Sequence, residues 1–169
     1  MRWLTIGTLL CLTAAHSQAA PPRVVVRVDL TRYAGTWYEI ARYPNFFQKQ
    51  CAGGTTATYE LRPDGKITVI NRCREQDGDT SEARGKAWVV DRATNAKLKV
   101  QFFWPFSGAY WVIELDPDYR WAVVGHPDRK YLWILSRTPA LEPAVYDDIL
   151  RRIAVQGYDL KPIITTPQP

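Results

Sequence analysis

The chain has 169 residues, of which 46% are hydrophobic and 23% charged, and this balance fits one globular domain rather than a disordered or membrane-spanning chain. The formal net charge is +5, but lysines and arginines are scattered, without the basic stripe and interleaved stacking aromatics of a nucleic-acid groove. Nucleic-acid binding is therefore excluded, and the mild positive charge suggests at most peripheral attraction to anionic lipid membranes.

The first 19 residues have the pattern of a secretory signal peptide. Arg2 precedes an apolar run that extends to Ala15, and residues 17–19 form a small-x-small cleavage site. Export is therefore expected, and loss of Arg2 lowers the net charge to about +4. Cys11 is a candidate for lipidation, but Leu10 stands before it where a small residue is expected, and cleavage there would leave a stunted apolar run.

The domain proper is expected from residue 29 to 166, after a lead-in of residues 20–28 and before a frayed tail of residues 167–169. Residues 29–34 predict a short turn that caps one end of the fold, and Gly35 with Trp37 begins an alternating strand. Residues 44–48 break that strand into a loop at the opposite, open end. The two adjacent phenylalanines of this loop either fold over the opening as a lid or are buried as ordinary packing.

The next hairpin has the clearest alternation in the chain. Ala57, Tyr59 and Leu61 share one apolar face, and residues 63–66 form a turn signal. If Leu61 lies opposite Ile67, then Ala57 lies opposite Asn71, and this asparagine points into an otherwise apolar interior. Slippage by one residue would exchange the two faces.

Two cysteines, Cys51 and Cys73, remain once the leader is removed. An even count in an oxidising compartment favours a disulfide, and the alternative is a pair of unpaired buried thiols. The separation is 22 residues, so a bridge would stabilise the fold by roughly 3 kcal/mol.

The remaining strands repeat the alternating pattern. Gly85 and Ala87 face inward and leave space, whereas Trp88, Trp111 and Trp121 point outward. Exposed tryptophans of this kind could form the contact surface of a homodimer, although some of them must lie beneath a helix. Further strands are expected at residues 97–102, 109–115, 121–126 and 131–135, with Glu114 placed inward opposite Ala122.

Eight strands with short turns are enough to close an up-and-down barrel that holds one small ligand. The expected fold is therefore all-β: an eight-stranded antiparallel up-and-down β-barrel with one C-terminal α-helix packed outside. The helix is predicted from Pro143, a start residue, to a stop at Gly157, with Val145, Ile149 and Ile153 on one face. Residues 158–165 then return as a short strand at the barrel edge.

Three motifs carry a resemblance to a known family. They are Gly35-Thr36-Trp37, then Asp128-Arg129-Lys130-Tyr131 before the last strand, then Arg137 after it. Together they resemble the signature of the lipocalins, and longer phrases such as residues 131–139 are similar to the bacterial outer-membrane members and, more distantly, to apolipoprotein D. The resemblance covers about residues 29 to 164 and implies that Arg137 covers the face of Trp37, a contact worth roughly 0.5 to 2 kcal/mol.

The resemblance implies non-catalytic transport or storage of a small hydrophobic ligand, a fatty acid or lysophospholipid, by a periplasmic protein associated with the outer membrane. By the same resemblance, Tyr59, Asn71, Tyr110 and Trp133 match positions that line the pocket. Tyr110 and Asn71 are candidate hydrogen-bond donors to a head group near the mouth, and Trp133 is a wall for the chain. An inner surface of aromatic and aliphatic side chains suits such a ligand, although a solid core is the alternative.

Two other functions remain open. A haem or tetrapyrrole carrier would use His126, the one histidine left after the leader, with Tyr110. An enzyme would need a nucleophile against His126, and Ser107 lacks an elbow motif. No metal-ligand spacing and no redox Cys-x-x-Cys is present, so no metal, cofactor or catalytic residue is expected.

Overall fold

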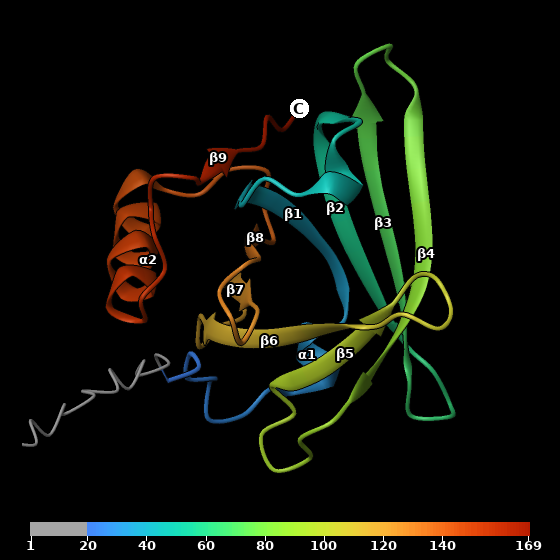
Figure 1. Cartoon of the computed structure of the whole chain (residues 1–169), viewed down its shortest axis with the longest axis vertical. Coiled ribbons are helices and arrows are strands. Elements are labelled where there is room, and N and C mark those ends of the chain that lie inside the picture. The colour runs from blue at the N-terminus through green and yellow to red at the C-terminus, as the bar shows by residue number, and fades with distance from the viewer. Residues whose placement is uncertain (1–19) are drawn as a thin grey trace, which may run out of the picture.

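In a computed structural model, which describes residues 20–169, the chain forms an eight-stranded antiparallel β-barrel with one helix outside it (Figure 1). Strand β1 pairs with both β2 and β8, so the sheet closes on itself. The elements in chain order are α1 (Leu30–Tyr33), β1 (Gly35–Arg42), the 3₁₀ turn η1 (Phe46–Gln48), β2 (Cys51–Leu61), β3 (Ile67–Glu75), β4 (Thr80–Val89), β5 (Lys97–Gln101), β6 (Gly108–Leu115), β7 (Trp121–Gly125), β8 (Leu132–Ser136), α2 (Pro143–Val155) and β9 (Ile164–Thr165). The expected signal peptide and Cys11 lie outside the described residues.

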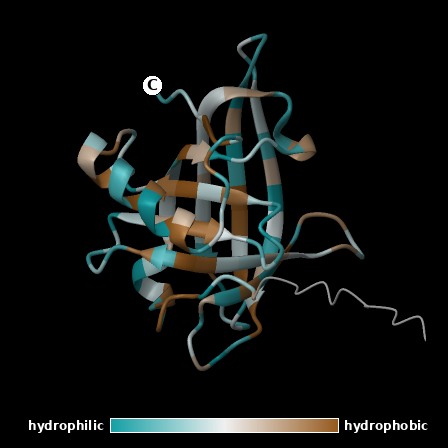
Figure 2. Cartoon of the chain, turned by 60° about the vertical axis from the view of Figure 1, so that its left-hand side comes forward, coloured by the Kyte–Doolittle hydropathy of each residue, from teal (hydrophilic) through white to brown (hydrophobic). Residues whose placement is uncertain are grey.

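The alternating pattern sets the strand faces as predicted. Leu61 pairs with Ile67, and Ala57 pairs with Asn71, because the turn at residues 63–66 fixes the register of β2 and β3. Hydrophobic and hydrophilic residues alternate along the strands in Figure 2. The interior is one apolar cluster around Trp37, and a second cluster lies between the outer barrel wall and α2.

One inward residue was predicted wrongly. A bulge in β6 places Glu114 opposite Val123 and Leu115 opposite Ala122, so Glu114 does not pair with Ala122. Two residues of the bulged strand then oppose one of its neighbour, and the faces exchange beyond that point. Glu114 lies outside, where its carboxylate accepts a hydrogen bond of 2.8 Å from the side chain of Gln156.

Helix α2 forms and packs as its pattern predicts. Ile149 and Ile153 are completely buried against the outer barrel wall, and Gly157 follows with a φ of +84°, a conformation that favours glycine. The helix covers Trp121, which is only 8% exposed. Trp121 is therefore unavailable to a partner. Neither described helix has both the length and the hydropathy needed to cross a membrane.

The predicted disulfide is confirmed, since Cys51 and Cys73 are bonded at the open end of β2 and β3. The expectation of a frayed tail is wrong. The Gln168 amide donates to the backbone oxygens of Glu39, at 2.6 Å, and Thr55, at 3.0 Å, and Gly54 donates to the Pro167 oxygen. Because β1 and β2 pair only along residues 35–38 of β1, residues 164–168 bridge the gap left between their upper halves.

Candidate functional site

The closed end of the barrel is built where the two ends of the domain meet. The Arg137 guanidinium carbon lies 3.8 Å from the centre of the Trp37 ring, as the resemblance implied. The guanidinium also donates to the backbone oxygens of Arg32, Tyr33, Ala34 and Thr36. Gly35 has a φ of +95°, and a side chain there would approach Arg137. The contacts of Arg137 therefore hold the closed end of the barrel together, and a ligand cannot enter there.

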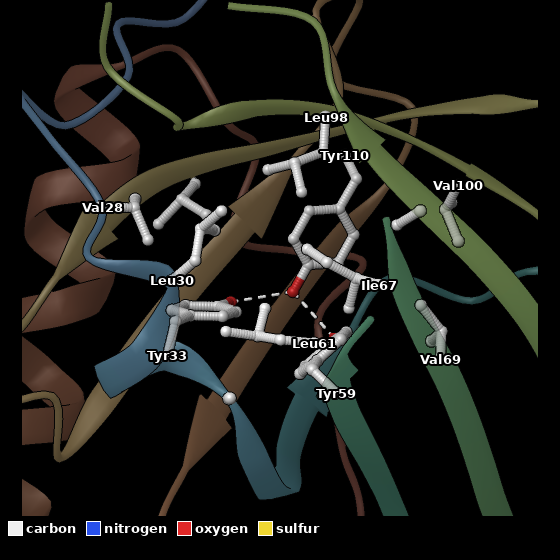
Figure 3. Close-up of a pocket in the computed structure, with 13 residues that line it drawn as sticks. Val28, Leu30, Tyr33, Tyr59, Leu61, Ile67, Val69, Leu98, Val100 and Tyr110 are labelled. Atoms are coloured by element: carbon white, nitrogen blue, oxygen red, sulfur yellow. Dashed lines mark hydrogen bonds between the residues drawn. The ribbon is translucent and has the colours of Figure 1, made fainter. Parts of the chain in front are cut away.

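A chain of three tyrosines crosses the interior (Figure 3). The ring of Tyr33, the first of them, lies beside that of Trp37, with ring centres 5.0 Å apart. The Tyr110 hydroxyl lies 2.8 Å from the hydroxyl of Tyr33, on α1, and 2.8 Å from that of Tyr59, on β2. Tyr33 and Tyr59 are 5% and 7% exposed, so their hydroxyls depend on Tyr110 for partners. Figure 3 shows the three side chains converging from different parts of the barrel, and they form what we call the tyrosine floor.

Burial raises the pKa of the floor hydroxyls. The pKa of Tyr59 rises to about 12 because its neutral form is favoured in a dry site. Desolvation likewise raises the pKa of Tyr33 and Tyr110 well above the ordinary value. Three neutral hydroxyls contain three protons, while the two links use only two of them. One O–H donor of the floor is therefore left over for a further acceptor.

Little space remains at the closed end. The void around the floor measures about 20 Å³ and is lined by apolar side chains such as Val28, Leu61 and Ile67. Such a void holds about one water molecule, whereas ligand pockets measure about 300–1,000 Å³. The closed half of the barrel is thus solid, and any ligand must lie between the tyrosine floor and the mouth.

The open half is lined by small residues around one amide. Asn71 lies directly between Ala57 on β2 and Ala83 on β4. Directly opposed residues of a sheet share a face, so all three point inward. Ala57 and Asn71 are half-buried and Ala83 is exposed, which means that solvent reaches this wall. The Asn71 amide oxygen is buried without a hydrogen-bond partner among the described residues, so the wall has an unused polar group.

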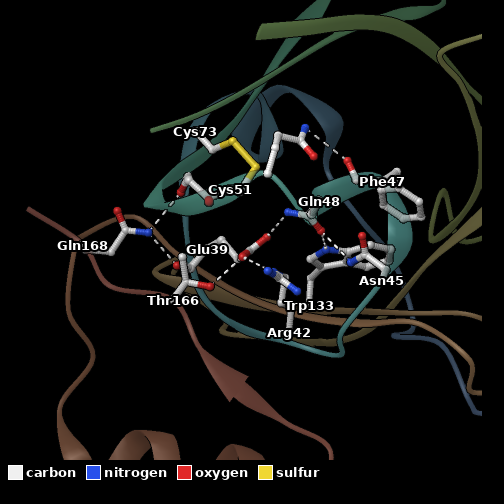
Figure 4. Close-up of a disulfide and its surroundings, with 12 residues drawn as sticks. Glu39, Arg42, Asn45, Phe47, Gln48, Cys51, Cys73, Trp133, Thr166 and Gln168 are labelled. Carbon is white, nitrogen blue, oxygen red and sulfur yellow. Dashed lines mark hydrogen bonds and ion pairs between the residues drawn. A yellow bond between two sulfur atoms is a disulfide. The ribbon is translucent and has the colours of Figure 1, made fainter. Parts of the chain in front are cut away.

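A hydrogen-bonded network holds the rim beside Trp133 (Figure 4). The Trp133 indole donates to the Gln48 oxygen at 3.0 Å, and the Gln48 amide donates to Glu39 at 2.8 Å. Thr166 donates to the same carboxylate at 2.6 Å, and Arg42 forms an ion pair with it at 3.1 Å. Burial raises the pKa of the Glu39 carboxyl, against the lowering effects of these partners. Trp133 is therefore fixed in orientation at the mouth.

The two adjacent phenylalanines are not buried as packing. Phe46 is 71% exposed and Phe47 46%, so the lid alternative fits better. The Phe47 ring contacts Tyr131 and Trp133, with ring centres 5.6 and 6.2 Å apart. The 3₁₀ turn η1 thus packs against the rim of the barrel, while much of its apolar surface remains exposed to solvent.

His126 lies in the loop between β7 and β8. Its Nδ1 is hydrogen-bonded to Asp128, and its ring contacts Tyr131 edge-on. No hydrogen bond joins it to Ser107 among the described residues, and the same residues contain no cluster of side chains suited to a metal ion. His126 thus belongs to the loop that shapes the mouth.

The four predicted pocket residues are distributed over different depths. Asn71 and Trp133 lie in the open half, whereas Tyr59 and Tyr110 form the floor, so the Tyr110 hydroxyl is deep and not at the mouth as expected. Sequence reasoning missed Tyr33, Glu39 and Gln48. Glu39 could have been found, because it shares the inward parity of Trp37 on a strand. Nothing in the local pattern marks Tyr33 or Gln48.

Comparisons with known proteins agree with this architecture. Residues 28–168 match the family model described as a lipocalin-like domain. The chain is 45% identical to the outer membrane lipoprotein Blc of Escherichia coli, covering 96% of this chain and 94% of that protein. It is 41% identical to the temperature-induced lipocalin-1 of Arabidopsis thaliana, covering 86% and 82%, and 33% identical to apolipoprotein D of Macaca fascicularis, covering 87% and 80%. The structure of insecticyanin from Manduca sexta superimposes with a TM-score of 0.72 at 24% identity, covering 93% and 88%.

Proposed function

Since the chain belongs to the lipocalin family, we propose that its ligand is a fatty acid or a lysophospholipid. Lipocalins bind small hydrophobic ligands and are generally non-catalytic. The acyl chain lies in the open half of the barrel, above the tyrosine floor. Trp133 forms one wall, and Asn71 with the floor residues Tyr59 and Tyr110 supplies the polar contacts. The protein carries or stores this ligand and performs no chemistry on it.

The observation that carries the proposal is the accessible wall around Asn71. Small side chains at positions 57 and 83 flank the Asn71 amide oxygen, which is buried without a hydrogen-bond partner among the described residues and is therefore an acceptor that a bound ligand would pair. Each methylene that leaves water contributes roughly 0.8 kcal/mol, so a chain of about ten would offset the entropic cost of binding and still give micromolar affinity. The spare O–H of the tyrosine floor offers one further polar contact at the deep end of the site.

A fluorescent fatty acid tests the assignment. Trp133→Ala should weaken quenching of the protein by the probe without unfolding the barrel, and Ala83→Trp should block the site by filling the open half. Ala93→Trp is the matched control, because Ala93 is exposed in the turn between β4 and β5, at the closed end. Unchanged affinity in both site variants would refute the placement of the ligand.

The native cargo is identified by extraction. Mass spectrometry of lipids extracted from the purified protein should detect fatty acids or lysophospholipids, whereas a retained Soret band would identify a haem carrier instead. Native mass spectrometry of the same sample reports stoichiometry and any homodimer.

The proposed location is the periplasm, in association with the outer membrane. The signal-peptide pattern of residues 1–19 and the similarity to proteins named outer membrane lipoprotein support this. Cell fractionation and sequencing of the mature N-terminus test it, since cleavage after Ala19 leaves a free amine and cleavage before Cys11 leaves a lipidated cysteine. A cytoplasmic chain that retains Met1 would exclude the proposed location.

A further inference from the structure

Over residues 20–169, the exposed aromatic surface is concentrated in two loops. All five phenylalanines of the sequence lie at positions 46, 47, 102, 103 and 106. Among the described residues, the aromatic side chains that are more than a third exposed are Phe46 (71%), Phe47 (46%), Phe103 (77%), Trp104 (85%) and Phe106 (78%). Strands alternate in direction round the barrel, so the β1–β2 and β5–β6 loops both lie at its mouth. Apolar surface is therefore gathered at one end of the molecule.

The β5–β6 loop, residues 102–107, has the larger share of this surface. Phe102 packs against the interior cluster, but Phe103, Trp104 and Phe106 make no ring contact with another aromatic residue of the described chain. The loop projects sideways from the barrel in Figure 1. Exposed apolar patches of this kind mark interaction sites, because their burial is favourable and the barrel itself gains nothing from them.

A groove of about 350 Å³ runs beside this loop and has two unlike walls. Phe102 and Trp104 form one wall, and Arg84 and Lys86 on β4 form the other. Both cationic residues are exposed, and the Arg84 guanidinium is partly compensated by Glu82 at 2.6 Å. An aromatic surface adjoining cations matches the boundary of an anionic bilayer, where Trp and Phe lie at headgroup level and basic residues meet phosphate.

We propose that the β5–β6 loop docks the protein on a phospholipid bilayer that contains anionic lipids. Phe103, Trp104 and Phe106 enter the headgroup region, while Arg84 and Lys86 contact lipid phosphates. The acidic tip of the β3–β4 hairpin points in another direction in Figure 1, away from this contact. The side of the mouth next to this loop then meets the membrane, so that an apolar molecule passes between bilayer and barrel with little exposure to water.

Vesicle flotation tests the aromatic part of the contact. The mature protein, purified after its natural N-terminal processing, is mixed with vesicles of phosphatidylcholine alone or of phosphatidylcholine with about a third phosphatidylglycerol. The triple variant F103S/W104S/F106S should bind the anionic vesicles at least about tenfold more weakly than the unaltered protein. V26S/V155S is the matched control, because Val26 and Val155 are 91% and 81% exposed away from this loop, and it should bind normally.

The cationic part has its own variant. R84Q/K86Q should reduce binding to anionic vesicles at least about threefold and leave binding to phosphatidylcholine unchanged. R92Q/K161Q removes the same charge from exposed positions elsewhere and should have a smaller effect. Raising the salt concentration should weaken vesicle binding of the unaltered protein to the level of R84Q/K86Q, since exposed charges are screened.

Binding of the fluorescent fatty acid without vesicles separates this inference from the proposed function. The triple aromatic variant should retain that binding. If F103S/W104S/F106S bound vesicles as well as the unaltered protein does, the docking inference would be overturned, whatever the result with the fatty acid. It would also be overturned if V26S/V155S lost as much vesicle binding as the triple variant. Conversion of a dimer to a monomer by the triple variant in vesicle-free buffer would also overturn it, because the loop would then be covered by a second copy.

Discussion

Replacement of the central member of the tyrosine floor gives the sharpest test of the interior. Tyr110→Phe keeps the ring but removes both hydroxyl links, and it leaves the buried hydroxyls of Tyr33 and Tyr59 without partners. Each buried polar group left unpaired costs about 1–3 kcal/mol, so the two together should cost the variant about 2–6 kcal/mol of unfolding free energy. Tyr33→Phe and Tyr59→Phe each remove one link and leave Tyr110 with its other partner, at a cost of about 1 kcal/mol.

Urea unfolding followed by tryptophan fluorescence measures the three free energies on one scale. With a slope of about 2 kcal/mol per molar, the midpoint of Tyr110→Phe should fall by about 1 to 3 M, and those of the end variants by about 0.5 M. The ordering is the critical result. If Tyr110→Phe costs no more than either end variant, water satisfies these hydroxyls, and the floor does not seal the closed half of the barrel.

Four further predictions concern residues outside the ligand site or at its edge. Arg137→Met should lower the unfolding free energy by about 3 kcal/mol or more, because the cation over the ring and the bonds to four backbone oxygens are lost together; a loss below about 1 kcal/mol in urea would contradict this. C51S/C73S should cost roughly 3 kcal/mol, and dithiothreitol should then lower the melting temperature of the unaltered protein only. Because the pKa of Tyr59 rises from 10.0 to about 12, its contribution to stability is complete below pH 10 and is lost as pH rises through the folded pKa. Between those limits the unaltered protein should lose up to about 3 kcal/mol of unfolding free energy relative to Tyr59→Phe, and parallel urea midpoints would refute the shift. Gln168→Ala should cost about 1–2 kcal/mol and speed amide exchange in the upper halves of β1 and β2; unaltered exchange there would show that the tail does not close the gap.

Local pattern was sufficient for most of the barrel wall. The β2–β3 register followed from one turn and one alternation, and the helix followed from the spacing of Ile149 and Ile153 with Gly157 as its stop. These features depend on neighbours in sequence, so a single chain reveals them. The cysteine pairing followed from a count and a compartment, because only two candidates remained.

Features that depend on distant contacts were missed. The bulge in β6 leaves no mark in the alternation, so Glu114 was placed on the wrong face. Gln168 was expected in a frayed tail, yet its side chain donates to the backbone oxygens of Glu39 and Thr55, which lie 129 and 113 positions earlier in the chain. The tyrosine floor joins α1, β2 and β6, and no periodicity predicts that three hydroxyls will meet. The depth of the candidate site therefore emerged only from the folded chain.

The meeting of Trp37 and Arg137 constrains how the molecule assembles. These residues are 100 positions apart, and the guanidinium bonds to residues 32–36 span 101 to 105 positions, so ring closure is a contact of very high order. Such contacts form slowly because the entropy of a long intervening loop must be lost first. Until β8 pairs with β1, both are edge strands with unpaired backbone groups that other chains can pair with. Newly exported copies are accordingly most vulnerable to aggregation in the interval before the last strand arrives.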